Sequence, residues 1–387
     1  MAPSLTNLKY HIIIIGAGIA GLYLIHKLKG MGFSIGAYEA AGEIGGTWHW
    51  NRYPGARCDV DSIFYSYQFD ESLQQEWVWT ERYASQPEIL RYLNFVADRF
   101  DLRKHIQLNT RIRSARYREF EKKWYLESEE GNIISATFCI MATGCLSAAN
   151  SPNFAGSCNF KGPIYHTAHW PKDPVNFSGL RVGIIGTGSS AIQAIPEIAK
   201  QASQLTVFQR TPNYVIPAQN RPLGIDELKK VKANYSSLRK EAKKTFGGFN
   251  FHLNENSATE MTPEELNLEY EKRWRDGGLA FMGSFSDLTF DIKANKTAQD
   301  FVRRKIKEIV KDPDLSKLLT PHDIFGCKRL CLDSGYFQTF NKPHVNLVDI
   351  SSTPITSITP KGILIDLSLI HISAPTRPRL ISYAVFC

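Results

Sequence analysis

The chain contains a stretch in which a continuous apolar run meets a glycine-rich turn. Residues 10–15, YHIIII, are mostly apolar and rich in isoleucine, which is typical of a strand buried on both faces of a parallel sheet. The turn GAGIAG follows, and the pattern then predicts a helix over residues 22–31 and a second strand over residues 34–38. This order of strand, glycine turn, helix and strand predicts a βαβ unit.

The same order recurs later in the chain. Residues 181–185 predict a strand, the turn GTGSSA follows, and a helix is expected up to residue 200. Residues 205–209 then predict the next strand. We therefore expect two nucleotide-binding units of related design.

The remaining segments carry their own hydrophobic patterns. Apolar residues at helical spacing predict helices, β-branched runs predict strands, and the Thr262–Pro263–Glu264–Glu265 motif predicts a capped helix start. In chain order we expect a helix over residues 89–100 with a cap at Ser85, a hairpin whose turn EEGN at 129–132 joins strands 124–128 and 133–141, a linker at 147–152, helices within 226–311, and strands within 344–364.

Composition fits an ordinary globular protein with two or three domains. The 387 residues are 43% hydrophobic and 22% charged, and the formal net charge is +8. The basic residues are spread out, and many fall on predicted amphipathic helices, so we expect no nucleic-acid partner. Apolar residues 12–25 are too few for a membrane span and glycines interrupt them, so we expect no signal peptide and no membrane segment.

The seven cysteines are odd in number and scattered, and none forms a CxxC pair. They predict neither a zinc site nor a disulfide framework, so we expect no metal. Such cysteine usage favours a reducing, cytoplasmic location.

The first turn has the chemistry of a dinucleotide site. Gly16, Gly18 and Gly21 form G-x-G-x-x-G, which allows a tight turn, a close approach of pyrophosphate, and close helix packing. Glu39 ends the second strand and can accept hydrogen bonds from a ribose 2′-hydroxyl, which disfavours a 2′-phosphate. We expect FAD or NAD here; the alternative is a glycine-rich joint without a ligand.

The second turn differs in two ways. Gly186 and Gly188 are present, but Ala191 replaces the third glycine. The strand that follows ends in Arg210 rather than in a carboxylate, and an arginine there suits a 2′-phosphate. We therefore expect NADP(H), with an ordinary surface arginine as the alternative.

A chain with one FAD-like and one NADP-like site is predicted to be a flavoenzyme that takes hydride from NADPH. Disulfide reductases share this layout but need a redox pair of cysteines. Cys58 has no other cysteine within ten residues, so that class is excluded.

Two further stretches carry a family resemblance. Residues 160–171, FKGPIYHTAHWP, fit F-x-G-x-x-x-H-x-x-x-W-P, the fingerprint of flavin-dependent Baeyer–Villiger monooxygenases. Residues 45–62, GGTWHWNRYPGARCDVDS, resemble the phenylacetone and cyclohexanone monooxygenase branch, and the similarity extends from residue 10 to residue 364. The matching fingerprint positions are Phe160, Gly162, His166, Trp170 and Pro171.

The resemblance implies a set of cofactor-binding residues. For FAD these are the adenosine ribose ligand Glu39 and the flavin contacts Thr47, Trp48, Trp50, Asp59, Val60, Tyr65 and Ile112. For NADP they are Gly188, Ser189, Ser190 and Gln193 at the pyrophosphate, and Arg210, Thr211 and Lys328 at the 2′-phosphate.

The resemblance also implies the reaction. Arg329, in FGCKRL, matches the catalytic arginine of the family, and Asp59 matches its partner. NADPH would reduce the flavin, and O2 would add to the reduced flavin to give a C4a-peroxyflavin. This peroxide would attack a ketone and lead to an ester or lactone, and an always-charged arginine suits the anions involved. Without the family resemblance, Arg329 would be interpreted as a surface arginine and Asp59 as a turn or cap residue. An amine- or sulfide-oxygenating flavin monooxygenase, or an inactive nucleotide-binding fragment, are the alternatives.

The expected fold class is α/β, with two Rossmann-like dinucleotide-binding domains for FAD and NADP and a helical insertion in the second. The expected segments are an FAD-binding domain at 1–146 that lacks its C-terminal part, an NADP-binding domain at 147–221 and 322–366, a helical insertion at 222–321, and a tail at 367–387. The tail resembles no family segment and looks like a translated sequencing adapter, so we expect the native sequence to stop near residue 366; the alternative is a genuine divergent tail. Uncovered strand edges and apolar surface would then make the chain poorly soluble and weakly active.

Overall fold

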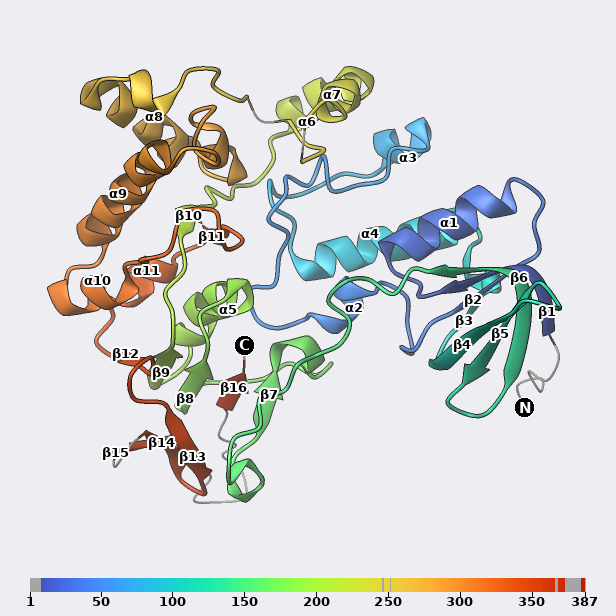
Figure 1. Cartoon of the computed structure of the whole chain (residues 1–387), viewed down its shortest axis with the longest axis horizontal. Helices are drawn as coiled ribbons and strands as arrows, with labels where there is room; N and C mark the ends of the chain where they lie inside the picture. The colour runs from blue at the N-terminus through green and yellow to red at the C-terminus, as the bar shows by residue number, and fades with distance from the viewer. Residues whose placement is uncertain (1–7, 246, 251, 366–367, 373–383, 387) are drawn as a thin grey trace. The chain divides into compact units, whose positions relative to one another are not determined.

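The computed structural model describes residues 8–245, 247–250, 252–365, 368–372 and 384–386. The chain forms two compact units (Figure 1). Unit 1 comprises Met1–Arg52 and Gln86–Asn150, and unit 2 comprises Tyr53–Ser85 and Ser151–Cys387. Within the described residues, none of the helices combines the length and the apolar character that crossing a bilayer requires.

Unit 1 contains one sheet of order β3-β2-β1-β6-β5-β4, in which β3, β2, β1 and β6 run parallel and β5 runs antiparallel to both its neighbours. Its strands are β1 (Leu8–Ile15), β2 (Ile35–Tyr38), β3 (Ile106–Gln107), β4 (Ile112–Arg118), β5 (Lys123–Ser128) and β6 (Ile133–Met141). Its helices are α1 (Ile19–Lys29), α2 (Thr47–Trp50), α4 (Gln86–Arg99) and the short η1 (Arg103–His105).

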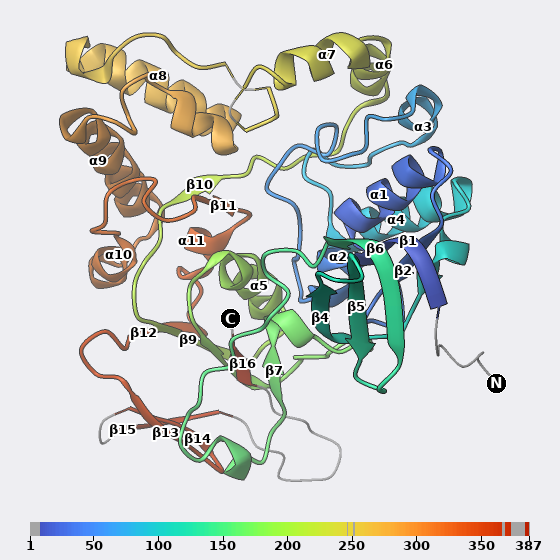
Figure 2. The same cartoon turned by 45° about the vertical axis from the view of Figure 1, so that its right-hand side comes forward.

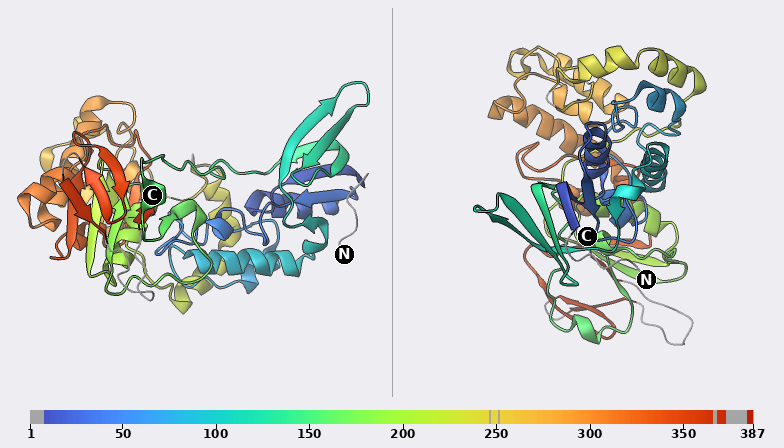
Figure 3. Two further views of the ribbon diagram at one scale, coloured as in Figure 1. Left: turned by 90° about the horizontal axis from the view of Figure 1, so that it is seen from below. Right: turned by 90° about the vertical axis from the view of Figure 1, so that its right-hand side faces the viewer.

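The first βαβ unit is confirmed. Ile13 and Ile14 of β1 have no solvent exposure, as a strand covered on both faces requires. Helix α1 begins at Ile19, three residues earlier than predicted, because Gly18 of the glycine turn is itself the N-cap. The predicted hairpin is also confirmed, because β5 and β6 pair antiparallel. Figure 3 shows the teal-to-green strands of unit 1 extending away from its blue strands.

Unit 2 contains a parallel sheet of order β12-β9-β8-β16-β7 and two smaller sheets, β10-β11 and β13-β14-β15. The strands are β7 (Ile164–His166), β8 (Arg181–Ile185), β9 (Gln204–Gln209), β10 (Val215–Pro217), β11 (Cys331–Asp333), β12 (Val345–Asp349), β13 (Ile355–Thr359), β14 (Gly362–Ile365), β15 (Ser368–His371) and β16 (Ala384–Phe386). Helix α5 (Ser189–Ala199) follows β8, so the second predicted βαβ unit is confirmed as well.

The predicted helical stretch lies in the same unit (Figure 2). The helices of this stretch are α6 (Ile225–Ala233), α7 (Tyr235–Ala242), α8 (Pro263–Asp276), α9 (Ile292–Ile309) and α10 (Pro313–Leu319), with the short η4 (Ala258–Glu260) and η5 (Leu279–Gly283). Unit 2 also contains α3 (Glu71–Glu76), α11 (Tyr336–Thr339) and the short η2 (Ser157–Asn159) and η3 (Thr167–His169). The capping box is present, because Thr262 Oγ1 accepts from the Glu265 N–H and Glu265 Oε2 accepts from the Thr262 N–H. Tyr270 of α8, Phe281 of η5 and Phe301 of α9 pack their rings together, which joins these three elements.

Two observations bear on the expected segments. Residues 53–85 belong to unit 2, although the sequence places them within the FAD-binding segment 1–146. In the expected foreign tail, residues 368–371 and 384–386 form β15 and β16, while residues 367, 373–383 and 387 lie outside the described part of the chain. The segment boundaries and the origin of the tail stay predictions.

Candidate functional site

The first glycine turn has a backbone that only glycine accommodates. Gly16 has a φ of +105°, and a Cβ there would lie 2.5 Å from the carbonyl oxygen of Ala142. The Gly16 N–H donates to the Tyr38 carbonyl at 2.8 Å, which ties the end of β1 to the end of β2. A Cβ at Gly21 would overlap the carbonyl oxygen of Gly16. The close helix packing expected of the third glycine is therefore observed.

The N-terminus of α1 is suited to bind an anion. Its N-cap, Gly18, has no side chain that could cap the first turn of the helix, and that turn contains no acidic residue. A second loop lies against it: the Gly45 N–H donates to the Ala17 carbonyl at 3.1 Å, and a Cβ at Gly18 would lie 3.3 Å from the Cα of Gly46. Sequence reasoning did not select Gly45 and Gly46, although two adjacent glycines are a signal for the positive φ that both adopt.

Glu39 is buried beside this turn. Its Oε2 accepts from the Ala17 N–H at 2.8 Å, and its Oε1 accepts from the Ala41 N–H at 2.9 Å. Each carboxylate oxygen can accept a second hydrogen bond. Glu39 is thus fixed at the end of β2 with acceptor capacity left for ribose hydroxyls, which fits the adenosine part of a dinucleotide.

The other predicted flavin contacts are divided between the two units. In unit 1, Trp48 of α2 is buried, Trp50 packs edge-on against His49 with ring centroids 5.0 Å apart, and Ile112 begins β4 against a small hydrophobic cluster. Thr47 is the first residue of α2, directly after the double-glycine loop. The remaining predicted contacts, Asp59, Val60 and Tyr65, belong to unit 2.

The second glycine turn repeats the geometry of the first. Gly186 also has a φ of +105°, and its N–H donates to the Phe208 carbonyl at 2.9 Å. Gly188 is the N-cap of α5 and, like Gly18, leaves the helix terminus without a side-chain cap. Ala191 is fully buried in place of the third glycine, so a methyl group is accommodated here. Unit 2 therefore has a second anion-binding helix terminus.

The segment after β9 is held against this turn. Thr187 Oγ1 donates to the Thr211 carbonyl at 3.0 Å, and the Asn213 side-chain amide donates to the Thr187 carbonyl at 2.6 Å. Arg210 is exposed at the end of β9. An exposed guanidinium in this position fits a 2′-phosphate.

Lys328 is also exposed, and its ammonium pairs with Asp323. In the described part of the chain, no hydrogen bond or ion pair joins Lys328 to Arg210 or Thr211. The expectation that all three bind the 2′-phosphate stays a prediction.

Asp59 and Arg329 meet although they are 270 positions apart. Arg329 Nη2 lies 3.2 Å from Asp59 Oδ2, and the arginine side chain remains 66% exposed while the aspartate side chain is 9% exposed. Gln193 Nε2 donates to the other oxygen, Oδ1, at 3.2 Å. Burial raises the pKa of the Asp59 carboxyl, and Arg329 and Gln193 act in the opposite direction. The pair predicted from the resemblance is thus in contact.

Two thiols lie near this pair. Ser189 Oγ, on the first residue of α5, lies 3.2 Å from the Cys331 Sγ at the start of β11. Burial raises the pKa of Cys58 to about 12 and also raises that of Cys331. Both thiols therefore stay protonated at neutral pH and are poor nucleophiles.

The fingerprint residues lie on both sides of β7: Phe160 and Gly162 precede the strand, His166 ends it, and Trp170 and Pro171 follow it. Trp170 is buried between the rings of Tyr165 and Phe177, at centroid distances of 5.3 and 6.2 Å. His166 Nδ1 accepts from the Ala168 N–H at 3.1 Å and so caps the following turn. Phe160 packs against a hydrophobic cluster, and Gly162 and Pro171 are partly exposed. These contacts support a structural role for the motif.

The fold and the two turns define an α/β protein with two Rossmann-type dinucleotide-binding units. Comparison with protein families specifies the class further. Residues 9–224 match the FMO-like family, described as flavin-binding monooxygenase-like. The chain belongs to this family.

Individual relatives are Baeyer–Villiger monooxygenases and similar enzymes. A Baeyer–Villiger monooxygenase from Pseudooceanicola batsensis is 41% identical over 360 residues, which are 92% of this chain and 66% of that protein. The chain thus spans just under two thirds of the length of this curated relative.

Solved structures of monooxygenases are also similar to the chain. An oxidised steroid monooxygenase bound to NADP is 47% identical with a TM-score of 0.93, covering 98% of this chain and 71% of its own. A cyclohexanone monooxygenase from Rhodococcus bound to NADP+ is 38% identical with a TM-score of 0.94, covering 98% and 70%.

Proposed function

We propose that this chain belongs to an FAD- and NADPH-dependent monooxygenase that inserts one oxygen atom of O2 next to a ketone carbonyl and gives an ester or lactone. Per turnover, one NADPH and one proton are consumed, and the second oxygen atom leaves as water. The relatives named above support this reaction class.

We assign FAD to unit 1 and NADP(H) to unit 2. In unit 1, the uncapped terminus of α1 would bind the pyrophosphate and Glu39 would bind the ribose. In unit 2, the uncapped terminus of α5 would bind the pyrophosphate, and Arg210 would distinguish NADP from NAD by its 2′-phosphate. When bound, the two cofactors would supply the electrons and the activation of O2.

The single observation that carries the proposal is the Asp59–Arg329 contact. Asp59 holds one nitrogen of the guanidinium, while the exposed remainder of the side chain can present further N–H donors to a ligand. Arg329 would stabilise the negative charge that develops on the carbonyl oxygen of the ketone. A buried carboxylate partner keeps the orientation of the guanidinium before the ligand arrives.

The test uses the 387-residue chain reconstituted with FAD. The chain is incubated with NADPH, ¹⁸O2 and a panel of cyclic and aryl ketones, and the products are analysed by gas chromatography with mass spectrometry. We expect bound flavin absorbance and an ester or lactone that carries one ¹⁸O atom. Mass spectrometry detects the product even when turnover is slow.

Two results would contradict the proposal. Sulfoxides or N-oxides formed from sulfides or amines, with no ester from any ketone, would indicate the other flavin monooxygenase chemistry. Absence of bound flavin and of NADP+ binding would indicate a nucleotide-binding remnant without activity.

A further inference from the structure

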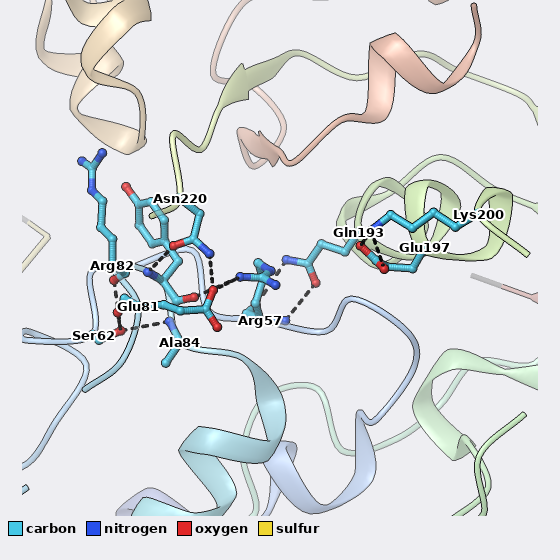
Figure 4. Close-up of polar contacts among 10 residues, drawn as sticks. Arg57, Ser62, Glu81, Arg82, Ala84, Gln193, Glu197, Lys200 and Asn220 are labelled. Carbon is cyan, nitrogen blue, oxygen red and sulfur yellow. Dashed lines mark hydrogen bonds and ion pairs between the residues drawn. The ribbon is translucent and has the colours of Figure 1, made fainter. Parts of the chain in front are cut away.

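The side chain of Gln193 is directed at the segment that precedes Asp59. Gln193 lies one turn into α5, and only 8% of it is exposed. Figure 4 shows it directed at Arg57, while Glu197 and Lys200 lie farther along the same helix. The partners of its amide lie in this neighbouring segment.

The amide of Gln193 uses its full hydrogen-bonding capacity on residues 53–59. Its Oε1 accepts from the Tyr53 hydroxyl at 2.9 Å and from the Arg57 N–H at 3.3 Å. Its Nε2 donates to the Arg57 carbonyl and to Asp59 Oδ1, both at 3.2 Å. A glutamine amide has two donors and two acceptor positions, so none is left for a phosphate oxygen.

The backbone of the same segment also lies directly on α5. Gly55 has a φ of +79°, and a Cβ there would overlap the carbonyl oxygen of Gln193. Glycine is therefore required for the close approach. The contact between α5 and residues 53–59 is made by main chain as well as by the Gln193 amide.

The opposite side of the segment is held by a second set of contacts (Figure 4). The Arg57 guanidinium donates to Glu81 Oε2 at 3.0 Å and to the Tyr83 carbonyl at 3.2 Å. The same Glu81 oxygen accepts from the Asn220 side-chain amide at 2.5 Å, and Asn220 Oδ1 accepts from the Tyr83 N–H at 2.9 Å. The loop that carries Asp59 is thus fixed from two sides.

Asp59 depends on this arrangement more than an exposed carboxylate would. A buried carboxylate must be paired to stay ionised, and Asp59 has two side-chain partners, Arg329 and Gln193, one for each oxygen. Arg329 is exposed, so its orientation depends on the place where Asp59 is held. A shift of Asp59 would therefore move the guanidinium.

We infer that Gln193 is a positioning residue that holds Asp59, and through it Arg329, rather than a ligand of the NADP pyrophosphate. For its effect on catalysis, the inference rests on the proposed function of Arg329. It replaces the pyrophosphate contact that the family resemblance implies for this residue.

The test compares three variants of the full chain with the wild type. Gln193→Met keeps the size of the side chain and removes its hydrogen bonds. Asp59→Asn removes the charge of the partner, and the double variant closes a thermodynamic cycle. Glu197→Gln, one turn along α5, removes only an exposed ion pair with Lys200 and is the matched control.

Three quantities are measured: the unfolding equilibrium constant in urea, the Kd of NADP+ by calorimetry, and kcat and KM for ester formation. We expect positions 193 and 59 to be coupled at least fivefold in the unfolding constant. For Gln193→Met we expect kcat to fall tenfold or more, while the Kd of NADP+ stays within twofold. Glu197→Gln should change none of these.

Additive effects in the cycle, or a tenfold weaker Kd of NADP+ with kcat unchanged, would overturn the inference. If the wild type forms no ester, the proposed function fails, but the cycle still decides whether Gln193 holds Asp59.

If Gln193→Met does not fold, Tyr53→Phe replaces it. This variant loses one hydrogen bond to Gln193, so kcat should fall while the affinity for NADP+ is unchanged. A normal kcat in Tyr53→Phe would overturn the inference.

Discussion

At the scale of single residues, the side chain on which the proposed chemistry depends is Arg329. Changing Arg329 to Ala removes the guanidinium, and we expect ester formation to fall about 10²–10³-fold, as for loss of an oxyanion donor. Arg329→Lys keeps the charge without the planar fork and should recover only part of the rate. Product formation is measured by gas chromatography, with Arg304→Ala on the exposed face of α9 as the control. A rate for Arg329→Ala within twofold of the wild type would exclude this role.

Arg210 is the residue expected to select the nicotinamide cofactor. Because charge-assisted hydrogen bonds contribute about 1.5–3 kcal/mol, Arg210→Ala should weaken NADP+ binding by about 10- to 100-fold. The affinity for NAD+, which lacks the 2′-phosphate, should change less than twofold. Calorimetric titration with both nucleotides measures this, and Lys200→Gln on the same unit is the control. Equal losses for NADP+ and NAD+ would show that Arg210 does not contact the 2′-phosphate.

At the scale of elements, the two glycine turns resemble each other but tolerate different substitutions. A Cβ at Gly188 meets nothing within 4 Å and φ there is negative, so Gly188→Ala should leave the free energy of unfolding within about 0.5 kcal/mol of the wild type. The same methyl group would occupy the approach of the pyrophosphate and weaken NADP+ binding. Unaltered NADP+ binding in this variant would contradict the assignment of the turn.

Gly21→Ala is the contrasting change in the first turn. Its Cβ would overlap the carbonyl oxygen of Gly16, so the backbone must shift, and we expect a destabilisation of about 1–3 kcal/mol with loss of FAD binding. Urea unfolding and flavin absorbance measure the two effects. Ala191 occupies the equivalent position in unit 2 and is fully buried there. The expected loss of stability in Gly21→Ala therefore comes from the close packing of α1 and not from the motif in general.

The start of α8 provides a pH-dependent element. Hydrogen bonds from the Thr262 N–H and hydroxyl lower the pKa of Glu265 below its ordinary value of 4.5. A depressed pKa means that the ionised group stabilises the fold above the unfolded value and that this contribution disappears as the pH falls through the folded value. Glu265→Ala should therefore destabilise the protein at pH 7 and have a smaller effect under acid conditions in urea unfolding. Glu264→Ala, in the same helical turn, is the control, and an equal difference at both pH values would contradict the prediction.

At the scale of the whole molecule, the two compact units should respond to different ligands. We expect FAD to slow hydrogen exchange at the amides of residues 16–19 and 45–47 in unit 1, because these residues form the first glycine turn and the loop that lies against it. NADP+ should slow exchange at residues 186–190 and 211–213 in unit 2. Mass spectrometry of exchange measures both, and protection of unit 1 by NADP+ with no change in unit 2 would reverse the assignment.

The elements themselves follow from local pattern. The strands at residues 10–15 and 181–185, the hairpin at 129–132 and the capping box at Thr262 were all predictable, because apolar spacing, turn residues and caps act within a few residues. The start of α1 was missed by three residues because the glycine turn passes directly into the helix.

What the sequence alone determined is the pair of βαβ units, the chemistry of their glycine turns and, through its motifs, the family. Only the tertiary structure decided that residues 53–85 pack in unit 2, that Gly46 lies against Gly18, and that Gln193 gives its whole amide to residues 53–59. The physical reason is distance along the chain. Propensities and caps act between near neighbours, whereas a contact such as Asp59–Arg329, 270 positions apart, exists only when the folded backbone brings its partners together.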